Sequence, residues 1–302
     1  MSQFNHRISI NTFLTIPLLV VFFLTGCSIV SSTPTPTPEP PTPTPLPPTP
    51  TSLPMAIRVN GAGILLSDYE EEGKRFEAAR QTLGKNISPE DSKTRILDDL
   101  IGSELLYQAA VKNGYVLSDT DLEARIAQLI QSAGGNDVFN TWLHNNFYSI
   151  ESFHRSLARS LGAAWQRDQI IKALPETAEQ IHARQILFVR EESAVNYRQK
   201  VDNGSDFATL ATEADPVTDG DLGWFPRGYL LQPEVEAAAF SLQPGEVSQV
   251  IKSSIGYHLI QVIEKDPARP LSPDARAILE STALKDWVKQ AKTQAQIEIL
   301  VP

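Results

Sequence analysis

A run of prolines near the amino terminus limits which part of this chain can pack into a fold. Eleven of the 22 prolines of the 302-residue chain lie within residues 33–54, most of them alternating with threonine. Proline fixes φ and lacks an N–H donor, so the run favours an extended polyproline II spacer, which at roughly 3.1 Å per residue would reach on the order of 70 Å. A ligand for a proline-recognition domain and an O-glycosylated stalk are the alternatives. Packed structure is therefore expected from Met55 onward, in about 250 residues that suffice for one large or two small domains.

The residues before the proline run have the pattern of a secretory signal. Arg7 precedes an apolar stretch at residues 8–24, which closes with Leu24-Thr25-Gly26-Cys27. The stretch is shorter than the roughly 20 apolar residues of a spanning helix. Its last four residues resemble the bacterial lipobox, which implies a signal peptide over residues 1–26 and a lipid on Cys27, followed by a tether to residue 54. An ordinary signal peptide and a buried apolar helix with a stray thiol are the alternatives. The expected location is outside the cytoplasm, with the lipid in the bacterial cell membrane.

Composition excludes several classes of chemistry and of partner. Cys27 is the only cysteine, so the mature chain can form no internal disulfide and offers no other thiol as nucleophile or metal ligand. A net charge of −10 without a basic run argues against a nucleic-acid partner and leaves the lipid, rather than charge, as the membrane anchor. Asp215, Asp219 and Asp221 lack the spacing of a calcium loop and favour a turn. We expect no metal site and no cofactor.

Residues 55–177 are predicted to form a mostly helical module. A β segment at residues 56–66 turns at Asn60-Gly61, and Ser67 is expected to cap the first helix, which extends to residue 83. Apolar stripes and capping residues predict further helices at 88–113, 118–134, around 139–143, and 150–174. After a proline-bounded linker at 267–273, a helix at 273–294 and a closing strand at 297–301 complete residues 267–302.

Residues 178–266 have a different pattern, with a β-α-α-β-α-β-β order in under about 100 residues. This order predicts a small α+β domain on an antiparallel sheet. Its motifs are Gly220-Asp221-Leu222-Gly223-Trp224-Phe225, Ala239-Phe240, Pro244-Gly245-Glu246-Val247-Ser248 and Gly256-Tyr257-His258. Together they resemble the parvulin family of peptidyl-prolyl cis/trans isomerases, and the helical block looks like the amino-terminal module of SurA- and PrsA-type extracytoplasmic foldases. That resemblance implies that the α+β domain is an insert and that the terminal helix returns to the module. We expect residues 297–301 to pair near residues 57–59.

The resemblance also assigns site residues. Leu230 and Val235 match positions that line the pocket for the proline ring, and Phe240 matches an aromatic at its base. Four positions match the polar cluster around the substrate amide: Asp215, Ser253, His258 and Gln185. The alignment at Asp215 needs a gap, because the loop to Gly220 is shorter than usual. For His258 alone, a hydrogen-bonded core histidine is the alternative.

Two of these positions depart from the family pattern. The family carries histidine where this chain has Gln185, and glutamine cannot offer an imidazole. His182 lies three residues earlier, and odd spacing on a strand points it to the opposite face. At Val235 the family usually has phenylalanine, so the ring pocket is expected to be looser, at a cost of about 1 to 2 kcal/mol of ring binding, or roughly tenfold per 1.4 kcal/mol. Reduced rather than absent activity is expected.

The sequence therefore predicts a membrane-anchored isomerase that assists the folding of exported polypeptides containing X-Pro bonds. The alternative is a non-catalytic chaperone in which the parvulin-like domain only binds peptide. The helical module is either a scaffold or a holdase with a groove lined by Trp142, Phe147 and Trp165. Those three aromatics are also typical of a core.

Overall fold

The computed structural model describes residues 53–301. The predicted signal peptide, Cys27 and nearly all of the proline run lie outside these residues. Within them the strands form two sheets, one of three strands in the order β2-β1-β7 and one of four strands in the order β4-β3-β6-β5. No helix in this range combines the length and apolar character needed to cross a membrane.

The helical module opens with a tight hairpin between β1 (Met55–Val59) and β2 (Ala62–Leu65). Asn60 and Gly61 form its turn with φ of 52° and 85°. Positive φ at both central residues is the geometry that matches the twist of paired strands, and Asn-Gly tolerates it best. The predicted turn at Asn60-Gly61 is therefore confirmed.

Five helices follow the hairpin, and serine caps set most of their starts. They are α1 (Leu66–Thr82), α2 (Pro89–Lys112), α3 (Asp119–Ala133), α4 (Asn136–Asn145) and α5 (Ile150–Lys172). The side chains of Ser88, Ser118 and Ser149 each accept a hydrogen bond from the backbone N–H three residues later. The prediction that Ser67 caps α1 is wrong. Strand β2 passes directly into the helix, because the N–H of Leu66 is held by the carbonyl of Pro54 at 2.9 Å.

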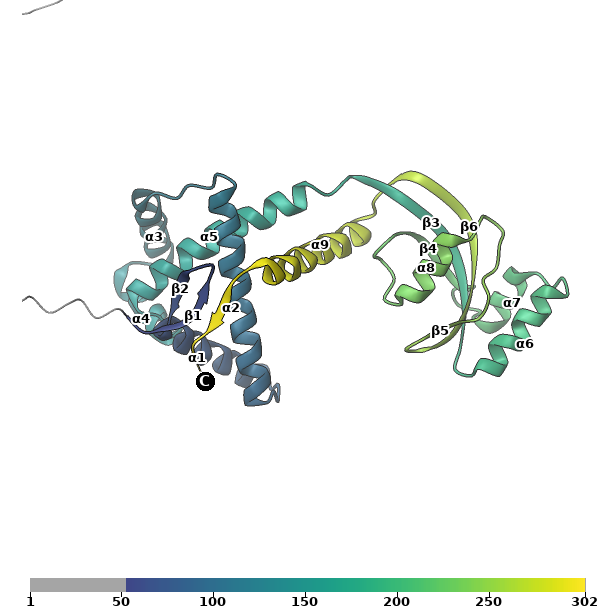
Figure 1. Ribbon diagram of the computed structural model, residues 1–302, viewed down its shortest axis with the longest axis horizontal. Coiled ribbons are helices and arrows are strands. Elements are labelled where there is room, and N and C mark those ends of the chain that lie inside the picture. The colour runs from purple at the N-terminus through teal and green to yellow at the C-terminus, as the bar shows by residue number, and fades with distance from the viewer. Residues whose placement is uncertain (1–52, 302) are drawn as a thin grey trace, which may run out of the picture. The chain divides into compact units, whose positions relative to one another are not determined.

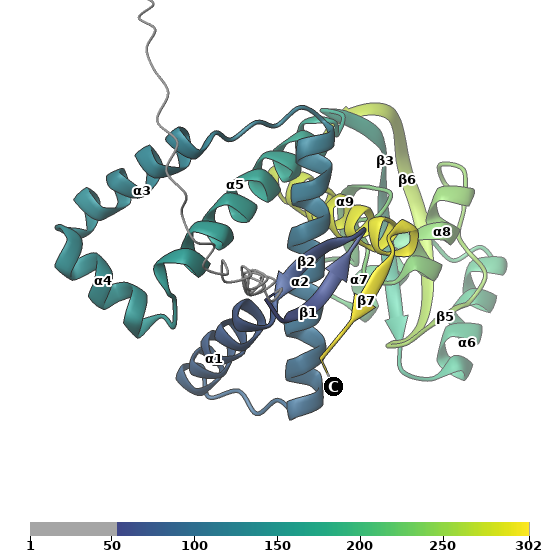
Figure 2. The ribbon, with the colours of Figure 1, turned by 60° about the vertical axis from the view of Figure 1, so that its left-hand side comes forward.

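The carboxyl end of the chain returns to this module. Helix α9 (Pro273–Gln294) packs on α2 and α5, and β7 (Ile297–Ile299) pairs antiparallel with β1, as Figures 1 and 2 show. Ile57 lies opposite Ile299 and Val59 opposite Ile297, which confirms the predicted pairing. Trp287 of α9 packs against a core of buried residues from β1, β2 and α2. The α+β region between α5 and α9 is therefore an insert in sequence.

The α+β domain has seven elements in the predicted order. They are β3 (Thr177–Phe188), α6 (Glu191–Asp202), α7 (Phe207–Ala214), β4 (Asp221–Pro226), α8 (Pro233–Ser241), β5 (Ile251–Ser253) and β6 (Gly256–Pro270). Helix α8 covers one face of the sheet, where Ile181 and Ile260 join Val235 and Phe240 in one core. On the other face Ile186 and Leu259 pack with residues of α6 and α7. Both faces are thus buried by short helices.

Strand β6 is longer than the prolines predict. Residues 267–270 were expected to begin a linker, but β6 continues through them and pairs Pro270 with Thr177. The register shifts between Ala178 and Gln180, so Pro267 lies in a bulge, where a residue without an N–H donor disturbs no ladder. Gln180, which is 2% exposed, also donates its side-chain amide to the carbonyls of Arg269 and Pro270 at 2.9 and 3.0 Å. These bonds extend the ladder beyond the expected boundary at residue 266.

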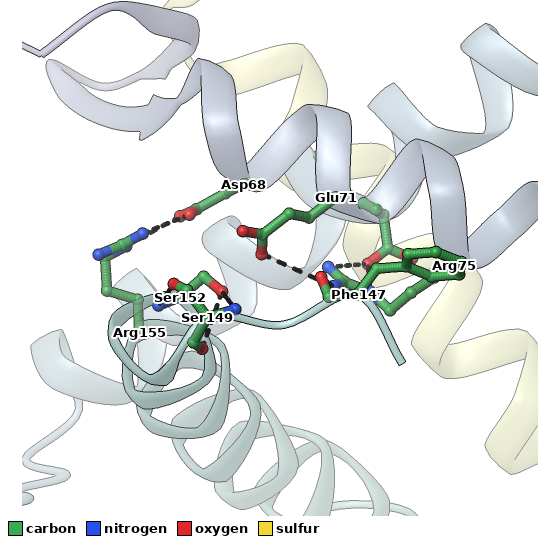
Figure 3. A network of polar contacts seen from close by, with 8 residues as sticks. Asp68, Glu71, Arg75, Phe147, Ser149, Ser152 and Arg155 are labelled. Carbon is green, nitrogen blue, oxygen red and sulfur yellow. Dashed lines mark hydrogen bonds and ion pairs between the residues drawn. The ribbon is translucent and has the colours of Figure 1, made fainter. Parts of the chain in front are cut away.

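A polar network joins α1 to α5 and to the segment before α5 (Figure 3). Asp68 of α1 is 7% exposed, and Arg155 of α5 binds both of its carboxylate oxygens, with Nε to Oδ2 at 3.0 Å. Arg75 donates to the carbonyl of Phe147 at 3.0 Å and lies over the ring of Tyr148. The ion pair of Asp68 and Arg155 thus links α1 to α5.

Removal of Arg155 is expected to destabilise the helical module, because Asp68 would keep a largely buried charge without its partner. We predict that Arg155→Ala lowers the free energy of unfolding by about 2 to 3 kcal/mol. This is less than the roughly 3 to 5 kcal/mol lost when a fully buried pair is broken, because the Arg155 side chain is 38% exposed. The loss is measured by urea unfolding, monitored through the circular dichroism signal of the helices. The matched control is Arg58→Ala, which removes the exposed pair with Glu298 and should cost under about 1 kcal/mol. Equal losses for the two variants would contradict the prediction.

Candidate active site

A chain of hydrogen bonds runs through His258 on the α8 face of the sheet. The histidine is 1% exposed, and its Nε2 lies 2.7 Å from the hydroxyl of Ser253. Its Nδ1 lies 3.1 Å from Oε1 of Gln185. An amide oxygen only accepts, so Nδ1 carries the hydrogen and Nε2 accepts from the Ser253 hydroxyl. Three of the four side chains that the sequence assigned to the polar cluster are therefore in contact.

Burial keeps His258 neutral. Removal of the imidazole from water lowers the pKa of His258 below its ordinary value of 6.5, and the nearby negative charge of Glu234 opposes this shift only in part. A neutral ring offers one donor and one acceptor, which Gln185 and Ser253 occupy. At neutral pH the cluster can orient dipoles without carrying charge.

The β5–β6 hairpin brings Ser253 to His258. Ser253 pairs with Gly256 across the turn, and its hydroxyl oxygen also accepts the N–H of Ile255 at 3.2 Å. Gly256 has φ of 147°, and a Cβ at this position would lie 2.4 Å from the carbonyl oxygen of Phe188. Only glycine permits this close approach, so the Gly256-Tyr257-His258 motif fixes the turn that places the serine.

A second glycine fixes the loop on the other side of Gln185. The N–H of Gln185 donates to the carbonyl of Gly220 at 2.8 Å. A Cβ on Gly220 would lie 2.2 Å from the carbonyl oxygen of Gln185, and φ at Gly220 is +66°. The loop between α7 and β4 therefore lies directly against β3 beside Gln185.

Asp215 begins this loop and faces the same cavity as Gln185. The cavity has a volume of about 400 Å³, and Gln185, Asp215 and Gly220 are among the residues that line it. The Asp215 carboxylate accepts the hydroxyl of Thr218 and the N–H groups of Val217 and Thr218, and these bonds hold its pKa below the usual range. Asp215 is thus an ionised group at the cavity, separate from the hydrogen-bond chain of His258.

The three residues assigned to the proline-ring pocket lie together. Val235 and Phe240, 1% and 6% exposed, belong to the core under α8, and Leu230 packs against it from the preceding loop. The guanidinium of Arg227 lies 4.0 Å above the centre of the Phe240 ring. Val235 is a buried member of this core, and the looser ring pocket expected from valine in place of the family's phenylalanine stays a prediction.

His182 takes no part in this cluster. Its Nε2 lies 2.8 Å from Oδ1 of Asp221, and its ring stacks on Trp224. The same carboxylate oxygen accepts the N–H of Gly223 at 2.8 Å, so Asp221 sets the turn that the sequence predicts. The placement of His182 away from Gln185 is confirmed.

The aromatic residues of the helical module divide between core and surface. Trp142 and Phe147 are 44% and 39% exposed, whereas Trp165 is half-buried and packs on Tyr115. Trp142 also stacks on Tyr148 and Phe139, so its exposed edge belongs to a packed aromatic group. Trp165 is therefore the one of the three that contributes to the interior.

Sequence reasoning missed two residues that shape the site. Leu222 of β4 is half-buried against the same core as Leu230, and it also lines the cavity beside Gln185. Glu236 of α8 binds the backbone of the loop that carries Leu230. Leu222 lies inside the Gly-Asp-Leu-Gly motif, which could have indicated it. Nothing in the sequence around Glu236 distinguishes it from a solvated acid in the first turn of a helix.

Comparisons with known proteins agree with this arrangement. Residues 169–264 match the model of the PPIC-type PPIASE domain, and residues 1–164, more than half of the chain, match the SurA-like N-terminal domain. The foldase protein PrsA of Oceanobacillus iheyensis is 30% identical over 245 residues, which cover 74% of this chain and 81% of that protein. That of Geobacillus sp. (strain WCH70) is 35% identical over 238 residues, covering 74% and 85%. A crystal structure of the peptidylprolyl isomerase PrsA from Bacillus cereus covers 77% of this chain and 87% of that chain, at 24% identity and a TM-score of 0.45. With a SurA-like N-terminal domain followed by a PPIC-type peptidyl-prolyl isomerase domain, this chain belongs to the PrsA family of foldases.

Proposed function

We propose that this protein is a membrane-anchored extracytoplasmic foldase whose isomerase domain catalyses rotation about X-Pro bonds in exported polypeptides, with Asp215, Gln185, Ser253 and His258 in the polar site. The observation that carries the proposal is the hydrogen-bond chain from Gln185 through His258 to Ser253, at 3.1 and 2.7 Å. Unfolded or partly folded chains are the proposed substrates. The proposed parts are a tether at residues 27–54, a helical module at 55–177, an isomerase domain at 178–266 and a return segment at 267–302.

The reaction makes and breaks no covalent bond. The barrier to rotation is about 18 to 20 kcal/mol, and catalysis in milliseconds requires a gain of roughly 10⁴ to 10⁵ in rate, or about 5.5 to 7 kcal/mol. Planar amide resonance places negative charge on the carbonyl oxygen, and this charge diminishes as the bond twists. An ionised carboxylate facing that oxygen disfavours the planar state more than the twisted one. Asp215 is the group proposed for this role.

The remaining residues have binding and orienting roles in the proposal. Leu230, Val235 and Phe240 hold the proline ring in an apolar site, which removes the amide from water. Gln185 fixes the tautomer of His258, and His258 in turn orients the Ser253 hydroxyl. The dipoles of this chain stay in place throughout the rotation, so no reorganisation opposes the twisted state.

A second function is favoured by two observations. Gln185 stands where the family has an imidazole, and Val235 is packed into the core rather than presented to a ligand. Both features support a non-catalytic chaperone whose parvulin-like domain binds peptide. The two functions differ in whether isomerisation depends on the polar site.

Alanine substitution at Asp215 or His258 separates these functions. We expect Asp215→Ala and His258→Ala each to lower kcat/KM for prolyl isomerisation by about tenfold or more, which corresponds to about 1.4 kcal/mol, because each substitution removes a hydrogen-bonding group of the polar site. Suppression of client aggregation should remain, and a wild-type circular dichroism spectrum should show that both variants fold. Equal isomerisation rates for wild type and both variants would establish the non-catalytic alternative.

Restoring the imidazole is the complementary test. Gln185→His should raise kcat/KM, because a second ring can donate to and accept from His258 where the amide oxygen only accepts. A coupled isomerisation assay with an Ala-Xaa-Pro-Phe peptide measures the change. Unchanged or lower activity would mean that glutamine is the functional residue here.

The lowered pKa of His258 should be detectable in the stability and activity of the protein at acidic pH. Its folded-state pKa lies below the unfolded value of 6.5, so the unfolded chain takes up the proton first and stability falls as the pH drops below about 6.5. Isomerase activity should be constant from about pH 7 to 8 and decline in the same acidic range. The NMR titration of the His258 ring should have its midpoint below 6.5. A midpoint at or above that value would contradict the stated cause, which is burial.

Membrane anchoring depends on Cys27 in this proposal. Expressed in a bacterium, the wild-type chain should incorporate labelled fatty acid and sediment with membranes, and Cys27→Ser should do neither, because the thiol is the only site for the thioether. A variant lacking most of the proline run serves as the control and should stay membrane-bound. Lipid labelling that persists in Cys27→Ser would refute the anchor.

A further inference from the structure

The carboxylate of Glu236 binds three consecutive backbone N–H groups. Its Oε1 accepts from Gly228 at 2.7 Å, and its Oε2 accepts from Tyr229 at 2.9 Å and Leu230 at 3.0 Å. All three donors belong to the loop that joins β4 to α8. Hydrogen bonds to an ionised acceptor are roughly twice as strong as those between neutral groups. The carboxylate of Glu236 therefore holds this loop more firmly than a neutral acceptor would.

The conformation of the loop explains why it needs such a contact. Gly228 has φ of +82°, and its N–H and those of the next two residues all reach the one carboxylate of Glu236. Successive N–H groups that converge in this way form a concave site for an anion. Gly228 is exposed, whereas Tyr229 and Leu230 are half-buried, so without an acceptor the N–H groups of Tyr229 and Leu230 would lose their partner at a position with limited access to water.

The three hydrogen bonds from the loop to Glu236, called the clamp below, join the two parts of the proposed ring site. Leu230 lies on the loop, whereas Val235 and Phe240 lie on α8, the helix that also carries Glu236. We propose that Glu236 is a positioning residue for prolyl isomerisation, which fixes Leu230 relative to Val235 and Phe240 and thereby sets the size of the ring site. This inference rests on the proposed function.

The neighbouring Arg227 is engaged elsewhere. Arg227, adjacent to the loop, lies over the Phe240 ring, and its guanidinium faces Glu179 at 3.4 Å. The charge of Glu236 is therefore balanced by the backbone donors. Glutamine at this position would keep one accepting oxygen and would turn its NH₂ group toward at least one N–H donor, so Glu236→Gln breaks the clamp with almost no change in volume.

Glu236→Gln is compared with Glu246→Gln, a matched control. Glu246 accepts a single N–H, that of Gln243 at 2.7 Å, in a turn that carries none of the proposed ring residues. Two peptides are used, one with proline and one with its six-membered homologue pipecolic acid. For Glu236→Gln we expect KM for the proline peptide to rise about tenfold with a smaller change in kcat, and preference for proline over pipecolic acid to fall. Glu246→Gln should stay within about twofold of wild type.

Amide exchange gives an independent readout. The N–H groups of residues 228–230 should lose protection in Glu236→Gln while those of β3 and β6 keep it, which shows that the domain remains folded. Glu236→Gln could lose amide protection at residues 228–230 and still keep the wild-type KM and the wild-type preference for proline over pipecolic acid. That result would show that Glu236 has only a structural role and would overturn the proposal. If the wild-type chain itself fails to isomerise, the proposed function fails. The clamp is then judged by the dissociation constant of the proline peptide, which should rise in Glu236→Gln and not in Glu246→Gln.

Discussion

The antiparallel pairing of β3 with β6 is the interaction on which the isomerase domain depends. Leu187 lies opposite His258 and Gln185 opposite Ile260, so Gln185 and His258 are diagonal neighbours on one face of the sheet. Diagonal neighbours of this kind lie within reach of long side chains. A shift of one residue in the register would turn Gln185 to the opposite face, away from His258, and would also expose Ile181. The site and the core are therefore fixed by the same ladder.

The burial of His258 explains what the glutamine changes. In a two-histidine pair either ring can donate, so the hydrogen-bond direction can reverse. Gln185 accepts through its oxygen, which holds the hydrogen on Nδ1 and leaves Nε2 for Ser253. The departure from the family pattern thus removes an imidazole but gives the remaining one a single tautomer.

Local signals in the sequence predicted the fold where short-range chemistry decides it. The Asn60-Gly61 turn and the helices at 88–113 and 118–134 follow from residues within a few positions of each other, whereas the predicted Ser67 cap does not form. Prolines misled the prediction at residues 267–270, because a bulge accommodates Pro267 and the Gln180 side chain holds the opposite strand. The motifs grouped Gln185, His258 and Ser253, which are in contact, but they could not show that Val235 is buried or that Glu236 binds the loop before α8. Those contacts depend on tertiary packing, which spacing does not encode.

Separate cores allow the packing of the helical module and that of the isomerase domain to change independently. Among the described residues, the core around Ile57 and Trp287 shares no member with the core around Ile181 and Phe240. A substitution such as phenylalanine to valine at position 235 therefore alters the packing of the isomerase domain without affecting that of the helical module, since effects of distant sites without shared partners add. The module is completed by the pairing of β7 with β1 and by the packing of α9 on α2 and α5. If the module binds peptide, as the holdase alternative predicts, that binding can persist at any level of isomerase activity.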